Sequence, residues 1–293
     1  MSIWMKGMDV ANAMKENLTQ RVADLKNKGI VPCLTIVRVG NRPDDLAYER
    51  GAKKRMETLG VECQVLEFPE NVSQELFEEG FRKVNECPDV HGILLFRPLP
   101  AHLDEEAIQR MIDPHKDVDY MSPENAAKVF AGDDSGFAPC TAEAVVEMLK
   151  HYQVDLTGKN VTIVGRSMVV GKPLAMLMLK ENATIRVCHT KTVHLETLCK
   201  EAEILVAAAG KPRMITEDMV GEGAVVVDVG INVDENGKLC GDVDFKDIQE
   251  TASMATPVPG GVGSVTTSVL AKRLVHAAQL QNKDCLLYTS DAA

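Results

Sequence analysis

The chain has 293 residues, more than one hydrophobic core usually organises, so we expect two domains. Its 32 Lys and Arg against 43 Asp and Glu give a net charge of −11 with no basic stripe, which argues against nucleic acid or an anionic membrane as a partner. No apolar run approaches the roughly 18 to 20 residues of a membrane span, and the first residues lack a signal-peptide core, so the sequence predicts a cytoplasmic protein.

The first half of the chain predicts a layer of alternating helices and strands. A helical pattern ends at Gly29 and Pro32, and a second one starts after Asp44 and Asp45 and ends at Gly60. In chain order we expect a helix over 8–28, a strand over 33–39, a helix over 46–59, a strand over 61–68, a helix over 74–85 and a strand over 92–96. Because ligands of open α/β sheets bind at the carboxyl ends of strands, the proline-rich loops that follow are expected to face a cleft between the two domains.

The second half opens with a buried-strand pattern that passes into a glycine turn and then a helix. Gly165 permits the sharp turn, Ser167 offers a hydroxyl, and Gly171 lets the helix pack close to the strand with its N–H groups facing a pyrophosphate. The spacing is G-x-S-x-x-x-G rather than G-x-G-x-x-G. Taken alone it is a weak signal for a dinucleotide site, and a strand-to-helix turn without a ligand is the alternative.

Three further apolar runs strengthen the signal. They are rich in Val, Ile and Ala, are separated by helical patterning, and span 183–188, 203–208 and 224–229. These runs predict strands buried on both faces. We therefore expect an α/β protein whose second domain is a Rossmann-like, doubly wound parallel sheet.

The end of the second strand of this sheet bears on the choice of nucleotide. NAD-binding sheets usually place an acidic residue there to bind the ribose 2′-OH, whereas this strand ends in His189, Thr190 and Lys191, and Arg166 stands in the glycine turn. A cationic, hydroxyl-lined pocket favours the 2′-phosphate of NADP, with NAD as the alternative.

The expected domain limits follow from these elements. Residues 1–143 form the first domain, 144–263 form the nucleotide-binding domain, and a helix over 142–152 bridges them. A helix over 264–281 packs back on the first domain. The segment 283–293 fits no pattern and is expected to be a non-native, disordered tail.

The eight cysteines and seven histidines show no metal-ligand spacing. With no C-x-x-C pair, and several cysteines in apolar runs, we expect reduced, buried thiols, no disulfide and no metal site.

Taken in order, these segments resemble the methylenetetrahydrofolate dehydrogenase/methenyltetrahydrofolate cyclohydrolase family from about Met5 to Gln281. The motifs that carry the resemblance are Tyr48, Pro98-Leu99-Pro100, Lys116-Asp117-Val118-Asp119, Pro139-Cys140-Thr141, Gly165-Arg166-Ser167 with Gly171 and Pro173, Asp228-Val229-Gly230-Ile231-Asn232, and Thr256-Pro257-Val258-Pro259-Gly260-Gly261-Val262-Gly263. The resemblance implies oxidation of 5,10-methylenetetrahydrofolate to the methenyl form with NADP⁺ in one-carbon metabolism. In most relatives a second activity hydrolyses that product to 10-formyltetrahydrofolate. Tetrahydrofolate derivatives are the implied ligands, and a homodimer is expected.

The resemblance also implies the site residues. For the folate they are Tyr48, Phe96, Pro98, Leu99, Asp119, Pro259, Gly260 and Gly261. For the cofactor they are Gly165, Arg166, Ser167, Gly171, Pro173, His189, Thr190 and Ile231. Asp119 should accept hydrogen bonds from the N–H groups of the pterin, and Tyr48 should stack near the pterin or the bridging carbon. Tyr48, Asp119 and Lys53 are the candidate catalytic residues.

The chain departs from the family pattern at the water-activating position. Relatives usually carry a lysine four residues after the tyrosine, but here that residue is Ala52, and Lys53 lies about 100° further round the helix. Phe96 replaces the glutamine that holds this lysine in relatives. We therefore expect a dehydrogenase with weak or absent cyclohydrolase activity, because hydride transfer needs positioning while water attack needs activation.

Three alternatives remain open. One is a fully bifunctional enzyme, which a bulge at Gly51 that turns Lys53 into the site would favour. Another is a catalytically lapsed folate- or nucleotide-binding protein. The third is an unrelated two-domain dehydrogenase acting on another small substrate.

Overall fold

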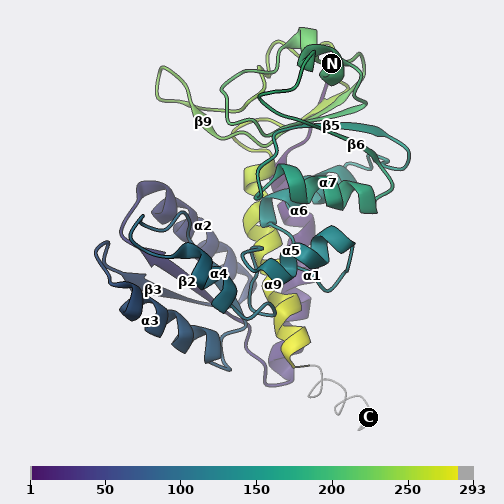
Figure 1. Cartoon of the computed structure of the whole chain (residues 1–293). Helices are drawn as coiled ribbons and strands as arrows, with labels where there is room; N and C mark the ends of the chain where they lie inside the picture. Colours follow the sequence, from purple (N-terminus) through teal and green to yellow (C-terminus); the bar gives the residue numbers. More distant parts are fainter. Residues whose placement is uncertain (1, 283–293) are drawn as a thin grey trace. The chain divides into compact units, whose positions relative to one another are not determined.

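The structure, a computed structural model, describes residues 2–282 and divides into two compact units (Figure 1). The six-stranded unit comprises residues 2–12, 129–133 and 139–266, and the three-stranded unit comprises 13–128, 134–138 and 267–282. The expected domain limits stay a prediction, and the expected tail at 283–293 lies outside the described residues.

The three-stranded unit has a parallel sheet in the order β3-β2-β4. The central strand β2 (Cys33–Val39) pairs in register with β3 (Glu62–Phe68), Cys33 opposite Glu62, and with β4 (Gly92–Leu95), Leu34 opposite Gly92. Every residue of β2 is buried because the strand is covered on both faces. One core of this unit gathers Val37, Phe77, Phe81, Ile93 and Ile108.

Helix α2 (Pro43–Leu59) connects β2 to β3. Proline in its first turn and the acidic Asp44 and Asp45 suit a helix N-terminus, and Gly60 ends the helix at φ 73°, a left-handed conformation that glycine adopts without strain. The unit also contains α3 (Gln74–Glu86) and α4 (Glu105–Met111), and α5 (Pro123–Ala131) begins in it.

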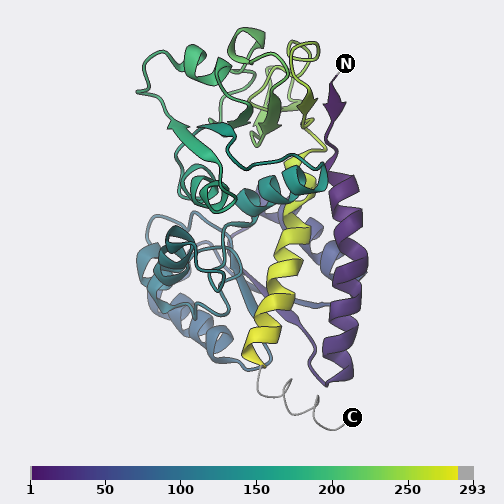
Figure 2. The same ribbon diagram turned by 90° about the vertical axis from the view of Figure 1, so that its right-hand side faces the viewer.

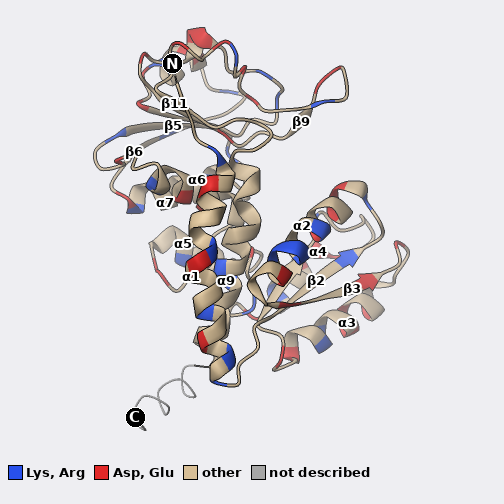
Figure 3. Cartoon of the chain, turned by 180° about the vertical axis from the view of Figure 1, so that it is seen from behind, with Lys and Arg blue, Asp and Glu red and all other residues tan. Residues whose placement is uncertain are grey.

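Helices α1 (Gly7–Asn27) and α9 (Thr266–Gln281) run side by side over their parts in the three-stranded unit, 13–27 and 267–281 (Figures 1 and 2). Arg21 Nη2 donates to Gln279 Oε1 at 2.7 Å across this contact. Basic and acidic residues are interspersed along α1 and α3 (Figure 3). These surfaces therefore carry no single-sign stripe.

The six-stranded unit has an all-parallel sheet in the order β6-β5-β7-β8-β11-β1. Its strands are β1 (Ile3–Trp4), β5 (Asn160–Val164), β6 (Thr184–Cys188), β7 (Ile204–Ala207), β8 (Val225–Asp228) and β11 (Met254–Ala255). The chain passes from β5 outward to β6 and then returns to the other side of β5 at β7. The predicted doubly wound sheet is confirmed, and its switch point lies at β5.

The connections of this unit include α6 (Cys140–His151), α7 (Gly171–Lys180), α8 (Leu195–Lys200) and an antiparallel hairpin of β9 (Asn232–Val233) and β10 (Leu239–Cys240). Short 3₁₀ turns lie at Glu217–Met219 and Val262–Ser264. The sequence did not indicate α4, α5 or any of the two-residue strands. No helix among residues 2–282 is long and apolar enough to cross a membrane.

Candidate functional site

Tyr48 lies on α2 with its ring against Phe96, which directly follows β4. The ring centroids are 6.0 Å apart at 74°, an edge-to-face contact. One turn further along α2, on the same helical face, Ala52 is fully buried. An aromatic ring and a methyl group therefore stand where the family pattern has a glutamine and a lysine.

Lys53 is directed elsewhere by an ion pair. Helix α2 is continuous through Gly51, so the structure has no bulge that would turn Lys53 towards Tyr48. The ammonium of Lys53 donates to Glu49 Oε1 at 3.0 Å, and Arg38 Nε donates to Glu49 Oε2 at 2.9 Å. Burial raises the pKa of Glu49, but the hydrogen bonds from Lys53 and Arg38 outweigh it and hold that pKa below its usual value. A carboxylate kept ionised in this way is a weak base.

Arg38 joins three segments of the three-stranded unit. Besides Glu49 on α2, its guanidinium donates to the carbonyl of Gly40 and to Asn41 Oδ1, both at 2.6 Å, and to Glu67 Oε2 on β3 at 2.7 Å. Arg38 is only 7% exposed. The network therefore fixes the loop after β2 and the helical turn that carries Tyr48.

The loop that carries Asp119 is organised by the buried carboxylate of Asp117. Asp117 Oδ1 accepts the N–H groups of Asp119 at 3.3 Å and Met121 at 2.8 Å. Its Oδ2 accepts Ser122 N–H at 2.7 Å and Asn125 Nδ2 at 3.0 Å. The first aspartate of the motif thus shapes the loop, while Asp119 is half-buried beside it. Asp117 was not among the residues predicted for the site.

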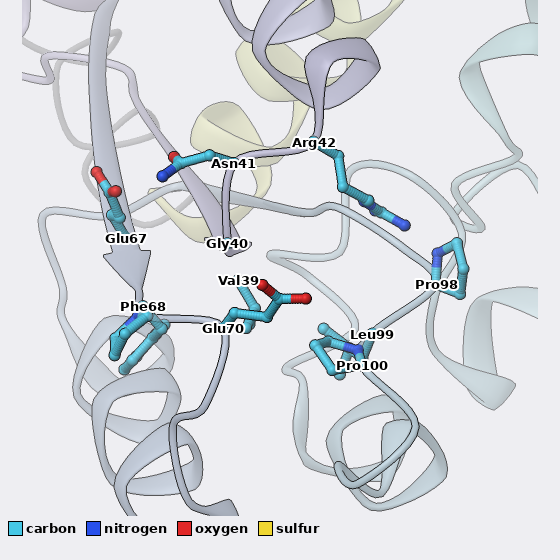
Figure 4. Close-up of a pocket in the computed structure, with 11 residues that line it drawn as sticks. Val39, Gly40, Asn41, Arg42, Glu67, Phe68, Glu70, Pro98, Leu99 and Pro100 are labelled. Carbon is cyan, nitrogen blue, oxygen red and sulfur yellow. The ribbon is translucent and has the colours of Figure 1, made fainter.

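A cavity of about 600 Å³ lies at the carboxyl ends of the strands in the three-stranded unit (Figure 4). Pro98 and Leu99, both predicted folate residues, line it together with Pro100. Arg42 and Glu70 also line it and supply opposite charges. Tyr48, Phe96 and Asp119 are not among its lining residues.

The glycine turn after β5 has the close approaches that a dinucleotide site requires. Gly165 has φ 136°, and a Cβ at this position would collide with the carbonyl of Ala208. A Cβ on Gly171 would collide with the carbonyl of Gly165, so only glycine lets α7 begin this close to the turn. Ser167 Oγ accepts the N–H of Val170 at 3.0 Å and so helps to shape the turn.

A cavity of about 270 Å³ lies at the switch point of the six-stranded sheet. Five of the predicted cofactor residues line it, namely Gly165, Arg166, Ser167, His189 and Thr190. Its lining residues come from the carboxyl ends of β5, β6 and β7. Ligands of open α/β sheets bind at such strand ends. Lys211, Leu195 and Met214 also line the cavity and were missed by sequence reasoning.

The remaining predicted residues lie outside this cavity. Pro173 is buried in the first turn of α7, and Ile231 is 71% exposed.

The glycine-rich loop, predicted to contact the folate, packs on the N-terminus of α1. The carbonyl of Gly260 accepts the N–H of Gly7 at 2.8 Å. Gly261 approaches Gly7 so closely that a Cβ on Gly7 would collide with its carbonyl. Pro259 belongs to the same loop and is exposed.

Two buried carboxylates brace the loops after β7 and β8. Asp242 accepts the N–H groups of Ala209 at 2.6 Å, Gly210 at 2.9 Å and Lys211 at 2.8 Å. Asp228 accepts three backbone N–H groups, including that of Asp242 at 3.0 Å. Burial raises the pKa of Asp228 to about 6, the hydrogen bonds partly offset this rise, and the nearby charge of Asp242 adds to it.

The described cysteines are free thiols, and the described residues contain no group of three or more His, Cys, Asp or Glu side chains that could hold a metal ion. Cys285 lies outside the described residues.

Comparison with known proteins assigns both parts of the chain. Residues 5–119 match the catalytic domain of tetrahydrofolate dehydrogenase/cyclohydrolase, and residues 139–282 match its NAD(P)-binding domain. The chain belongs to the tetrahydrofolate dehydrogenase/cyclohydrolase family. The resemblance inferred from the motifs is therefore confirmed, and the protein is an enzyme of this family.

Three relatives illustrate the similarity. The "Bifunctional protein FolD" of Alkaliphilus oremlandii is 56% identical over 96% of this chain and 99% of its own length. The crystal structure of the FolD dehydrogenase/cyclohydrolase from Campylobacter jejuni has a TM-score of 0.93 and 38% identity over 96% of this chain and 99% of that one. The Trypanosoma brucei FolD structure, complexed with NADP cofactor and inhibitor, has a TM-score of 0.89 and 35% identity over 95% of this chain and 98% of that one. These names favour the fully bifunctional alternative over the expectation of a single activity.

Proposed function

We propose that the protein oxidises 5,10-methylenetetrahydrofolate to 5,10-methenyltetrahydrofolate with NADP⁺, and that it also hydrolyses the methenyl product, more slowly, to 10-formyltetrahydrofolate. The observation that carries the proposal is the match of nearly the whole chain to both domains of the family. The switch-point cavity, which contains Arg166 and the glycine turn, supports the nucleotide part.

The residues around that cavity suit a bound NADP⁺. Gly165 and Gly171 bring the start of α7 close to the strand end, where free N–H groups favour a pyrophosphate. Arg166 places a cation among the hydroxyls of Ser167 and Thr190, with no acidic residue at the end of β6. When bound, NADP⁺ supplies the hydride acceptor.

In the three-stranded unit we assign orientation of the folate to Asp119 and contact with its ring system to Tyr48. Asp119 lies in a loop that Asp117 holds by hydrogen bonds, so its carboxylate is offered in a fixed place to the paired N–H donors of a pterin. Tyr48 is half-buried against Phe96, which leaves part of its ring available for stacking.

The hydrolytic activity rests on the relatives, which are called bifunctional. The residues near Tyr48 give it little support, because Ala52 has no proton-accepting group and Lys53 is paired with Glu49. We therefore place hydrolysis below oxidation in rate. The homodimer expected from the family resemblance is also part of the proposal, and light scattering tests it.

One assay with two readouts tests the proposed function. Purified protein is mixed with 5,10-methylenetetrahydrofolate and either NADP⁺ or NAD⁺, and formation of the reduced nicotinamide measures oxidation. Decay of added methenyltetrahydrofolate, followed at its own absorbance against an enzyme-free sample, measures hydrolysis. Failure to reduce either nicotinamide would refute the proposed oxidation, and a decay rate equal to that of the enzyme-free sample would refute the hydrolysis.

A further inference from the structure

The residues that line the switch-point cavity include a second basic one, from a segment that no dinucleotide motif covers. Arg166 comes from the turn after β5, whereas Lys211 comes from the loop after the adjacent strand β7. Both residues line the cavity of about 270 Å³, together with the hydroxyl-bearing Ser167 and Thr190. The cavity thus combines groups from loops about 45 residues apart in the sequence, brought together by the strand order.

The charge of this cavity is one-sided. Among the described residues that line it, Arg166 and Lys211 are basic and none is Asp or Glu. Lys211 has no ion pair among the described residues. Leu195 and Met214 add an apolar part to the same cavity. An adenine nucleoside that carries a phosphate has the matching chemistry, an apolar planar base beside an anion.

The backbone of Lys211 is fixed before any ligand arrives. Asp242 is fully buried, and its carboxylate accepts the N–H groups of Ala209, Gly210 and Lys211 in succession. Asn232 Nδ2 donates to the same carboxylate at 2.8 Å and holds it in place. Because the loop is already ordered, only the side chain of Lys211 loses freedom when it contacts a ligand.

We propose that Lys211 acts with Arg166 to bind the 2′-phosphate of NADP⁺ and is a determinant of the preference for NADP⁺ over NAD⁺. This inference rests on the proposed function. Arg166 offers a planar set of donors and Lys211 a mobile point charge, and the two approach the phosphate from neighbouring strand ends. The 2′-phosphate is the group that distinguishes the two cofactors, so a cation bound to it changes their relative affinities.

The test measures binding apart from catalysis. Isothermal titration calorimetry of the full-length protein gives the Kd for 2′,5′-ADP and the Kd for 5′-AMP. These two ligands differ only in the 2′-phosphate. In Lys211→Met, which keeps the backbone bond to Asp242, the Kd for 2′,5′-ADP should rise roughly 10- to 100-fold while that for 5′-AMP changes by less than about twofold. The preference of kcat/KM for NADP⁺ over NAD⁺ should fall by a similar factor.

Two control variants separate this effect from a general loss of charge. Lys211→Arg keeps a cation and should retain most of the affinity for 2′,5′-ADP. Lys246→Met removes an exposed lysine of the same unit, outside the cavity, and should leave both affinities unchanged. Equal thermal midpoints for all variants would show that the fold is intact.

Other outcomes overturn the inference. Equal weakening of 2′,5′-ADP and 5′-AMP in Lys211→Met would place Lys211 on a group that both ligands share. Unchanged affinities would make Lys211 a solvated surface residue. With either of these two results for Lys211→Met, the inference would fail. The proposed function would still stand if the wild-type protein bound 2′,5′-ADP and reduced NADP⁺. If wild-type protein bound neither ligand and reduced neither nicotinamide, the proposed function itself would fail.

Discussion

Replacing Lys53 by Ala tests whether the lysine at the shifted position takes part in hydrolysis. The ammonium is bound to Glu49 at 3.0 Å, and the side chain is 45% exposed, so solvent screens the pair and its contribution to stability is about 0.3 to 0.5 kcal/mol. Glu49 keeps its bond to Arg38 in the variant. We therefore expect Lys53→Ala to lower the free energy of unfolding by no more than about 0.5 kcal/mol and to leave oxidation and hydrolysis nearly unchanged.

The reverse change should create what the wild-type face lacks. Ala52 is fully buried, so Ala52→Lys alone overpacks its surroundings at a cost of about 1 to 3 kcal/mol. Phe96 lies against Tyr48, and Phe96→Gln vacates ring volume and supplies an amide that can hold the new amine. The double variant should therefore hydrolyse methenyltetrahydrofolate roughly tenfold faster or more, a gain that starts below the roughly 10²- to 10⁴-fold of a well-positioned general base because the new lysine lacks a pocket shaped for it.

The two rates are measured on the same preparations, as NADPH formation for oxidation and as methenyl decay for hydrolysis. Lys54→Ala is the matched control, because Lys54 is an exposed lysine on the same helix without a side-chain ion pair among the described residues. If Lys53→Ala lowered hydrolysis by about tenfold or more and left oxidation intact, Lys53 would be the water-activating residue. The reasoning from the continuous helix would then be refuted.

Three further predictions follow from the proposed sites. Arg166→Ala should raise KM for NADP⁺ roughly tenfold or more and leave KM for NAD⁺ unchanged; equal losses with both cofactors in steady-state kinetics would contradict contact with the 2′-phosphate. Asp119→Asn should weaken folate binding and turnover far more than the exposed control Asp89→Asn, since an amide presents a donor to the donors of the pterin; near-normal folate kinetics would place the pterin elsewhere. Because burial raises the pKa of Asp228 from 3.8 to about 6, its protonated form contributes stability that is fully present below pH 3.8 and is lost as the pH rises through about 6. Denaturant titrations give the free energy of unfolding of the wild type and of Asp228→Asn. The wild-type value minus the variant value should fall as the pH rises across this window, and a difference independent of pH would contradict the raised pKa.

The long elements of the fold could be predicted because their patterns are strong and local. The apolar run of β2 matches residues 33–39, and the runs of β6, β7 and β8 are recovered with ends that differ by no more than one residue. Strands β1, β9, β10 and β11 have two residues each, too few for any periodicity to show. Helices α4 and α5 have only seven and nine residues and follow proline-rich loops, so neither has a helical pattern long enough to be assigned from the sequence.

The site divides in a similar way. Residues that belong to contiguous motifs, such as Gly165, Arg166 and Ser167, were predicted and share one cavity. Lys211 was missed because it shares a cavity with Arg166 only through the strand order, in which β7 lies beside β5 on the side opposite β6. A single sequence does not reveal that order. One local signal was available. Asp242 is a carboxylate between the apolar Cys240 and Val243, and a carboxylate in such a run indicates a buried group that needs hydrogen-bond donors.

Buried carboxylates explain why the two units present their functional residues so firmly. The carboxylate oxygens of Asp117 accept hydrogen bonds from the loop that carries Asp119, and those of Asp242 accept hydrogen bonds from the loop that carries Lys211. Each accepts backbone N–H groups that would otherwise be unpaired in a buried loop, which stabilises one loop conformation over others. Both oxygens of each carboxylate are therefore engaged by protein, and neither residue needs to touch a ligand to matter for binding. It follows that Asp117→Asn, which puts an amide donor against N–H donors, should weaken folate binding through the position of Asp119. The effect should be absent when Asp119 is already Asn, because two residues that act through one contact are not additive.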